Sequence, residues 1–291
     1  MLTVSDAWSQ NLEPRRWTHL PVKSNFVGFG FGSSNGDIFL DEALQISDGK
    51  MDLYFLGAAY IHSFDFLGKT ARIDVSIPSA MGRWEGLRNG LPVSTRRFGL
   101  SDPSIRLSIN LKGSPALAGK EFASYRAANP VRTIIGVAID LTVPMGEYDP
   151  GLLINLGGNR FVLRPQLGVL HQRKKWEFET TASVFLYGRN DEMFGGVVRD
   201  QDPLWFIQGH VNYTFRPGVW AGFGAGYGYG GENTIGGSKK DDDGRVSFWS
   251  ASLGFPLSVK QSLKVTYAVS QTNTATGSDL DSIILSWNMM F

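Results

Sequence analysis

The sequence predicts an all-β chain that closes into an antiparallel transmembrane β-barrel of about twelve strands. Segments of about ten to thirteen residues alternate between apolar and polar side chains, which is the period of a β-strand. They are about twice as long as the strands of soluble sheets and match the tilted strand that crosses a bilayer. The links between them alternate between short and long, as the turns and loops of outer-membrane barrels do.

The C-terminal segment shows this alternation most clearly. Odd-numbered positions from Ile283 to Phe291 are apolar, whereas the positions between them include Ser282, Ser286 and Asn288. The other expected strands are 23–32, 51–62, 71–77, 105–112, 133–143, 160–171, 176–186, 205–215, 219–230, 245–255 and 262–270. An even number of strands places both termini on the periplasmic side.

Aromatic and glycine residues support the same prediction. Aromatic residues make up 12% of the chain, and many lie near the ends of the expected strands, where an interfacial girdle would form. Glycine accounts for 35 of 291 residues, about 12% against a usual share of about 7%. A row of alternate glycines from Gly222 to Gly228 would face the lumen and leave room for bulky neighbours.

Composition excludes several other classes of protein. There are 28 basic and 27 acidic residues, so no global field attracts nucleic acid. The absence of cysteine excludes disulfides and thiolate chemistry, and we expect no metal and no cofactor. No apolar run is long enough for a transmembrane helix. Residues 1–17 lack the apolar core of a signal peptide, and we interpret the chain as a mature form.

The chain is expected to have two parts. Residues 21–291 form the barrel, and residues 1–20 form a short periplasmic segment that packs under or into it as a small plug. One link on the short-turn side is unusually long, and its stretch GKEFASYRAA predicts a short periplasmic helix.

The candidate site is the inner face of the barrel. Its expected members are Arg72, Asp74, Arg106, Arg132, Asp140, Arg164, Glu177, Glu179, Phe185, Tyr187, Phe206 and His210. Further inward positions are Asp52, Tyr54, Lys112, Arg160 and Lys264. The charges could form a selectivity ring or polar solute pathway, and the aromatic rings could offer stacking surfaces. They could equally form a salt-bridge network that fills a closed barrel.

An enzyme is the third possibility. A barrel lipase needs a serine beside a histidine on the outer wall near the outer rim. None of His19, His62, His171 and His210 lies beside an obvious nucleophile, so no catalytic residue is assigned.

Several sequence blocks carry a resemblance to a known family. They are PRRWTHLP at 14–21, FLGKTARIDV at 66–75, GRWEGL at 82–87, GKEFASYRAANPV at 119–131, GEYDP and NLGGNRFVLRPQLGV between 146 and 169, QDPLW at 201–205 and YTFRPGVWA at 213–221. With the terminal strand, they resemble a bacterial outer-membrane transporter family associated with the phenol meta-cleavage pathway. The resemblance implies an outer-membrane barrel encoded near degradation genes, distantly like hydrocarbon and fatty-acid uptake barrels. It also implies that the barrel assembly machinery recognises the terminal Phe291.

We therefore expect an outer-membrane channel for passive uptake of small hydrophobic or aromatic compounds. Its expected partners are the lipid bilayer, lipopolysaccharide and a small hydrophobic solute. The alternative is a closed structural or adhesive barrel with a salt-bridged lumen.

Overall fold

The computed structural model describes residues 14–40, 44–274 and 276–291. Its helix is α2 (Gly119–Ala128), where the sequence predicts one. The strands are β1 (Ser24–Phe39), β2 (Ile46–Phe66), β3 (Lys69–Arg88), β4 (Leu91–Leu100), β5 (Ser104–Lys112), β6 (Val131–Thr142), β7 (Val162–Arg173), β8 (Trp176–Tyr187), β9 (Asn190–Met193), β10 (Val197–Gln201), β11 (Leu204–Arg216), β12 (Val219–Gly230), β13 (Asn233–Ile235), β14 (Ser238–Lys239), β15 (Gly244–Pro256), β16 (Gln261–Thr272) and β17 (Gly277–Met290).

The main sheet closes on itself as a barrel. Its order is β2-β1-β17-β16-β15-β12-β11-β8-β7-β6-β5-β3-β4, and the pairing of β2 with β3 closes the ring. β4 and β5 both pair with β3, along its later and earlier halves, and so share one position of the ring. The barrel therefore has twelve positions, all pairing antiparallel, which confirms the predicted fold.

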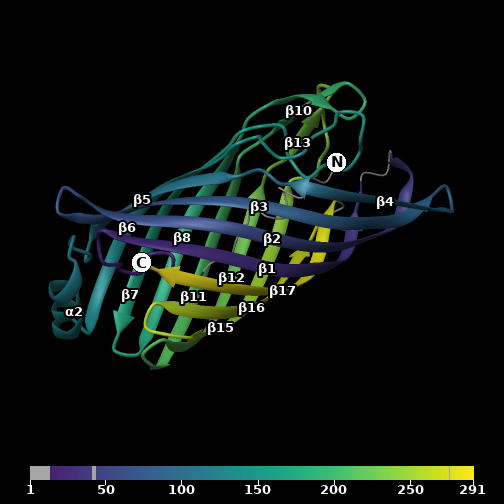
Figure 1. Cartoon of the computed structure of the whole chain (residues 1–291). Coiled ribbons are helices and arrows are strands. Elements are labelled where there is room, and N and C mark those ends of the chain that lie inside the picture. The colour runs from purple at the N-terminus through teal and green to yellow at the C-terminus, as the bar shows by residue number, and fades with distance from the viewer. Residues whose placement is uncertain (1–13, 41–43, 275) are drawn as a thin grey trace.

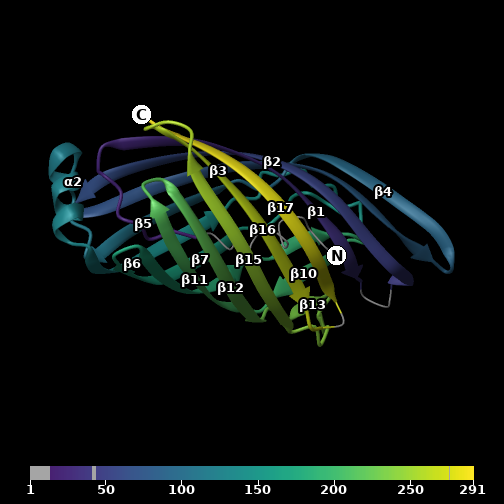
Figure 2. The same ribbon diagram turned by 90° about the horizontal axis from the view of Figure 1, so that it is seen from below.

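The two rims of the barrel differ (Figures 1 and 2). At the short-turn rim, β1 begins, β17 ends, and tight links such as Leu67–Gly68 join neighbouring strands. α2 lies at this rim. At the long-loop rim, β4 and the small sheet of β9, β10, β13 and β14 extend outward. In the described part of the chain, no helix is long and apolar enough to cross a membrane.

The outer wall carries the apolar half of the alternating pattern. On β17, Ile283 and Leu285 are exposed, and Leu285 pairs in register with the exposed Phe31 of the neighbouring β1. An apolar surface of this kind fits lipid, and a closed sheet can face lipid because its strands pair with one another around the ring.

Several strands extend further than the sequence pattern indicates. Residues 33–50 and 79–100 were expected to be loops, but β1, β2, β3 and β4 continue through most of them. At the beginning of the expected strand 51–62, next to this extension of β2, the pattern inverts: Met51, Leu53 and Phe55 point inward and are buried. The prediction that Asp52 and Tyr54 face the lumen was wrong, because Met51, Leu53 and Phe55 take the inward positions here and pack against Ile154 and Leu156.

One further inward assignment fails at the short-turn rim. Lys112 was expected in the lumen, but it is exposed. A register shift between Asn110 and Lys112 breaks the alternation of β5 at this point. A bulge of this kind re-aims the residues that follow it, and alternation in sequence cannot reveal it.

Candidate functional site

The predicted site residues all lie on the inner face of one half of the barrel wall. β3 carries Arg72 and Asp74, β5 carries Arg106, β6 carries Arg132 and Asp140, β7 carries Arg164, β8 carries Glu177, Glu179, Phe185 and Tyr187, and β11 carries Phe206 and His210. Most of these side chains are buried. The structure brings them together, but it does not leave them facing an open pore.

The N-terminal segment, here residues 14–22, enters the lumen and covers this half of the wall. Arg15 forms an ion pair with Glu177 at 3.3 Å. The backbone N–H of Arg16 donates to the carboxylate of Glu179 at 3.0 Å. These contacts give the buried Glu177 a counter-charge in addition to its hydrogen bond from Asn212, and they give the buried Glu179 a hydrogen-bond donor.

Trp17 is the anchor of the N-terminal segment. Its side chain is 1% exposed and lies against Gly136 on β6 and Gly168 on β7. A methyl group at Gly168 would come within 1.9 Å of the indole, so the wall accepts this ring only because the two residues have no side chain. The guanidinium of Arg106 lies over the ring at 4.9 Å.

A dense ion-pair cluster links the N-terminal segment to β3, β5 and β6. Asp74 accepts from Arg72 at 2.7 Å and from Arg106 at 3.4 Å. Arg16 lies 3.9 Å from both Asp74 and Asp140. The arginines hold these two carboxylates in place. Through Arg16, the cluster therefore also holds the N-terminal segment against the wall.

The inward aromatic rings are also occupied by cations. Arg164 lies 4.3 Å from the ring centre of Phe185 and 5.6 Å from that of Phe206. Arg160 lies 4.5 Å from that of Tyr187. These rings form the wall of the lumen together with the guanidinium groups, and their accessible faces for stacking on a solute are reduced.

The contacts of the N-terminal segment continue at the short-turn rim. His19 donates from Nε2 to the carbonyl of Pro115 at 2.8 Å, and its ring contacts Phe122 and Tyr125 of α2 edge-on. Burial lowers the pKa of His19 to about 4, against the raising effect of the Pro115 hydrogen bond; the nearby charges of Arg132 and Arg126 lower it further. The imidazole is therefore neutral at pH 7.

A second segment covers the lumen at the long-loop rim. This outer loop, residues 143–161, joins β6 to β7 and places Ile154 and Leu156 in an apolar cluster with Leu53, Phe55 and Trp84. This cluster explains why the inner face of β2 is apolar near the long-loop rim. The sequence contained a signal for it, since an extended apolar face that meets no lipid must meet protein.

Asp102 holds both ends of the outer loop. Its Oδ1 accepts from the backbone N–H of Gly146 at 2.8 Å, and its Oδ2 accepts from that of Gly158 at 2.7 Å. Arg97 adds a hydrogen bond from Nε to the carbonyl of Ile154 at 2.9 Å. Asp102 carries no signal in the sequence, because it lies in the short break between β4 and β5 and outside any alternating segment.

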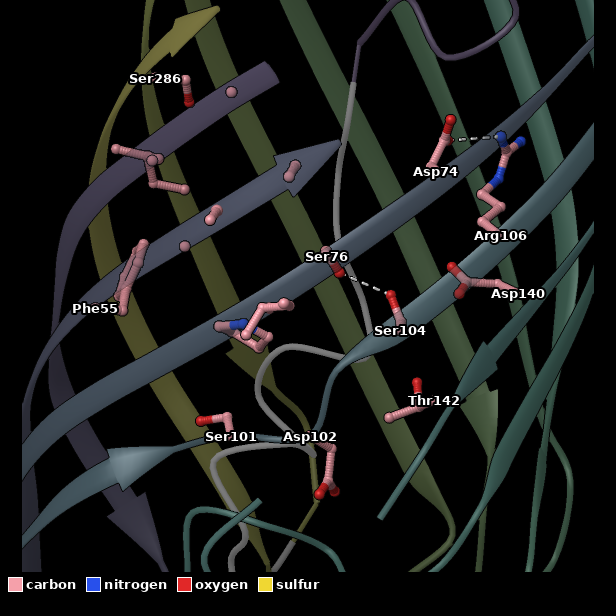
Figure 3. Close-up of a pocket in the computed structure, with 18 of the residues that line it drawn as sticks. Phe55, Asp74, Ser76, Ser101, Asp102, Ser104, Arg106, Asp140, Thr142 and Ser286 are labelled. Atoms are coloured by element: carbon pink, nitrogen blue, oxygen red, sulfur yellow. Dashed lines mark hydrogen bonds and ion pairs between the residues drawn. The ribbon is translucent and has the colours of Figure 1, made fainter. Parts of the chain in front are cut away.

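Between these two segments the lumen keeps a chamber of about 440 Å³ (Figure 3). Its wall is formed largely by β1, β2, β3, β16 and β17, on the side away from Trp17. Phe55, Leu53 and Ile284 make it apolar toward the outer loop, and Asp74 and Arg106 lie at its other end. Small hydroxyl residues line the remainder: Ser34, Ser76, Ser104, Thr142, Thr266, Ser270, Ser282 and Ser286.

One inward histidine has a serine nearby that the sequence analysis did not find. His210 pairs in register with Glu179 on one side and with Gly224 on the other, and Gly224 pairs with Ser250. His210 and Ser250 are each 4% exposed. They lie on the inner face, whereas a barrel lipase requires a serine and histidine that its lipid substrate can reach on the outer wall.

A closed antiparallel barrel with an apolar outer wall and a polar inner wall defines an outer-membrane β-barrel protein. The chain belongs to the family described as "Putative MetA-pathway of phenol degradation", which matches residues 30–280 and confirms the resemblance seen in the sequence.

Solved structures agree with this fold. An outer membrane channel from Pseudomonas putida F1 has a TM-score of 0.79 at 20% identity, with 97% of this chain and 100% of that chain covered. The transport unit of the autotransporter AIDA-I from Escherichia coli has a TM-score of 0.54 at 10% identity, covering 99% and 95%. No curated protein sequence matches the chain.

Proposed function

We propose that this protein is an outer-membrane channel for passive uptake of small hydrophobic or aromatic compounds. The observation that carries the proposal is the chamber of about 440 Å³ inside a transmembrane wall, apolar at one end and lined by hydroxyl groups elsewhere. A site of this volume, mostly apolar with a few polar groups, is typical of small-molecule binding. The channel named for the Pseudomonas putida structure and the phenol degradation named for the family support the same proposal.

The chamber suits a weakly polar solute better than an ion. Its apolar end is formed by Phe55, Leu53 and Ile284, where a hydrated ion would lose water without gaining a partner. The two segments that restrict access, the N-terminal segment and the outer loop, are held by non-covalent contacts alone, since the chain has no cysteine. Their movement would connect the chamber to the two sides of the membrane.

The rule for outer-membrane barrels orients the protein. Short turns lie on the periplasmic side and long loops outside, so the N-terminal segment and α2 would face the periplasm. Lipid would then cover the apolar outer wall, lipopolysaccharide would surround the long-loop rim, and Phe291 would present the terminal strand to the assembly machinery. Solute would enter past the outer loop and leave past the N-terminal segment.

A closed structural barrel is the second candidate, and a specific observation favours it. The single carboxylate of Asp74 contacts three arginines, Arg16, Arg72 and Arg106. Arg106 in turn packs over the buried ring of Trp17. Salt-bridged interiors of this kind fill small barrels that conduct nothing.

Single-channel recording of the refolded protein in planar bilayers distinguishes the two candidates. Because movement of the two segments would open a path for water and ions, the transporter predicts discrete conducting events, which phenol or 1-butanol reduces on addition. Phe55→Ala should weaken the block at least fivefold, because the ring forms the apolar end of the chamber. Phe31→Ala is the matched control, since its ring faces lipid from the adjacent strand.

The closed barrel predicts silence under the same conditions, from protein whose β-barrel circular dichroism and heat-modifiable gel mobility show that it is folded. It also predicts that cells expressing the protein admit phenol no faster than cells with an empty vector. A conductance that no hydrophobic solute affects would instead indicate a channel for hydrophilic solutes and contradict the proposed substrate class.

A further inference from the structure

The chamber wall carries one cation that has no partner in the described part of the chain. Lys264 lies on β16, is half-buried and lines the chamber. Within residues 14–40, 44–274 and 276–291, no hydrogen bond or ion pair involves its ammonium group. A partly desolvated ammonium without a counter-charge is unfavourable, so a lysine in this position is better explained by a ligand that supplies one.

The other charged residues on the chamber wall have partners. Including Lys264, the wall carries three acidic residues, Asp74, Asp102 and Asp140, and four basic residues, Arg16, Arg106, Arg160 and Lys264. Arginines contact Asp74 and Asp140, and two backbone N–H groups occupy Asp102. Arg160 donates to Gln201 at 2.5 Å. Lys264 is thus the one basic residue of the chamber wall for which the described part of the chain provides no partner.

The register of the strands shows what surrounds Lys264. It pairs with Ser286 on β17, which pairs with Gly30 on β1, which pairs with Gly57 on β2. No atom lies within 4 Å of where a side chain at Gly57 would begin. On the β17 side of Lys264 the inner wall therefore offers a hydroxyl, then two strands without a side chain and open space at Gly57, whereas on the β15 side Lys264 pairs with Gly254, which the ring of Trp220 covers.

The neighbouring row of inward residues, toward the long-loop rim, is apolar except for one hydroxyl. In the same four strands it consists of Thr266, Ile284, Gly32 and Phe55, and the ring of Phe55 lies over Gly32. Beyond this row lies Leu53. Successive inward residues of one strand, and therefore neighbouring rows, are roughly 7 Å apart. The chamber therefore changes from a cation to an apolar surface over the length of a short alkyl chain or an aromatic ring.

We infer that the chamber binds an amphiphile with a single anionic head group, a carboxylate being the simplest, with its head at Lys264 and Ser286 and its apolar body at Phe55 and Ile284. This inference rests on the proposed uptake function and adds to it a preference for charge. A charge-assisted hydrogen bond to a carboxylate in a water-poor cavity is stronger than one between neutral groups. The anionic ligand should accordingly bind more tightly than a neutral one with the same alkyl chain.

The test is isothermal titration of the full chain, held in a non-ionic amphipol, with decanoate, 1-decanol and decylamine. We expect decanoate to bind at least tenfold more tightly than 1-decanol. Lys264→Met should remove this difference, Lys264→Arg should keep it, and Lys264→Glu should make decylamine the preferred ligand. Lys260→Met, in the exposed turn before β16, is the matched control and should change nothing.

Each other outcome has a definite meaning. Equal binding of decanoate and 1-decanol, or full decanoate affinity in folded Lys264→Met, overturns the inference and leaves hydrophobic uptake standing. Binding of neither ligand, by protein with heat-modifiable gel mobility, overturns both this inference and the proposed chamber site. Preference for decylamine in the natural sequence would show that the acidic groups determine the field and would also overturn it.

Discussion

The indole N–H of Trp17 donates a hydrogen bond of 2.8 Å to the hydroxyl of Thr181, which lies on β8 in the barrel wall. This bond joins the N-terminal segment to a strand from the middle of the chain. Both groups are buried, so breaking the bond leaves two polar groups without water. The N-terminal segment therefore has one defined position in the lumen, and its release should be a discrete event.

Trp17→Ala should loosen the N-terminal segment without preventing barrel formation. Loss of a buried tryptophan costs about 3–5 kcal/mol in protein cores, and here most of that cost falls on docking of the N-terminal segment. In planar bilayers, the fraction of time in a high-conductance state should rise at least tenfold. Trp176→Ala is the control, because that side chain is 46% exposed on the outer wall. An unchanged open fraction would show that Trp17 does not restrict the lumen.

Gly168→Ala tests the same contact from the wall. The added methyl group would lie 1.9 Å from the indole of Trp17, and the strand backbone cannot yield that far, so the ring must leave. We expect a rise in open fraction similar to that of Trp17→Ala, and no further rise when the two changes are combined. Gly209→Ala is the matched control, since on the outer face of β11 the added atom meets only the backbone oxygen of Glu179 at an ordinary 3.7 Å. Additive effects of Gly168→Ala and Trp17→Ala would contradict a shared contact.

The barrel could be predicted from the sequence because its cause is local. Within the bilayer each strand meets lipid on one side and the lumen on the other, so apolar and polar residues alternate at a period of two. The same reasoning failed for Asp52 and Tyr54, because Phe55 beside them packs inward on the outer loop. The alternation within β2 does not show that a distant loop folds back over the lumen, and that contact makes the inner face apolar here.

The candidate site was only partly predictable for a different reason. Alternation identifies inward residues such as Asp74 and Arg106, but it cannot show that Arg16 would come between them and the lumen. Likewise, Lys264 was expected to face inward, but its lack of a counter-charge depends on how every neighbouring charge is paired. Pairing across the lumen is a property of the closed barrel, and single strands contain no record of it.

Docking of the N-terminal segment should weaken in acid through His19. Its pKa is lowered from an ordinary 6.5 to about 4 when docked, and its buried Nδ1 has no hydrogen-bond partner among the described residues. The neutral ring therefore favours the docked state, fully above pH 6.5, and this contribution is lost as the pH falls from about 6.5 toward about 4. Open fraction recorded between pH 7.5 and 4.5 should rise across that interval.

His19→Phe separates this effect from other titrating groups. A phenyl ring keeps the contacts with Phe122 and Tyr125 but cannot take up a proton. We expect the acid-induced rise to shrink by at least half in this variant, even though Arg126 and Arg132 still surround the site. An identical pH profile for His19→Phe and the natural sequence would assign the effect to other groups.

Asp102→Ala should release the outer loop, because one carboxylate holds the N–H groups of both Gly146 and Gly158. Hydrogen bonds to a charged acceptor contribute about 1.5–3 kcal/mol each, and their loss should raise the population of the displaced loop at least tenfold. Limited proteolysis of the folded protein should then cut within residues 143–161 at least tenfold faster. Asp65→Ala removes a bond of the same type, to the N–H of Gly68 in the turn at the opposite rim, and should leave that rate unchanged.

Faster cleavage in Asp102→Ala together with entry of phenol at an increased rate would identify the outer loop as the entrance. Faster cleavage without faster entry would place the limiting step at the N-terminal segment, and an unchanged cleavage rate would show that the contacts of Arg97 and Ile154 suffice to hold the loop.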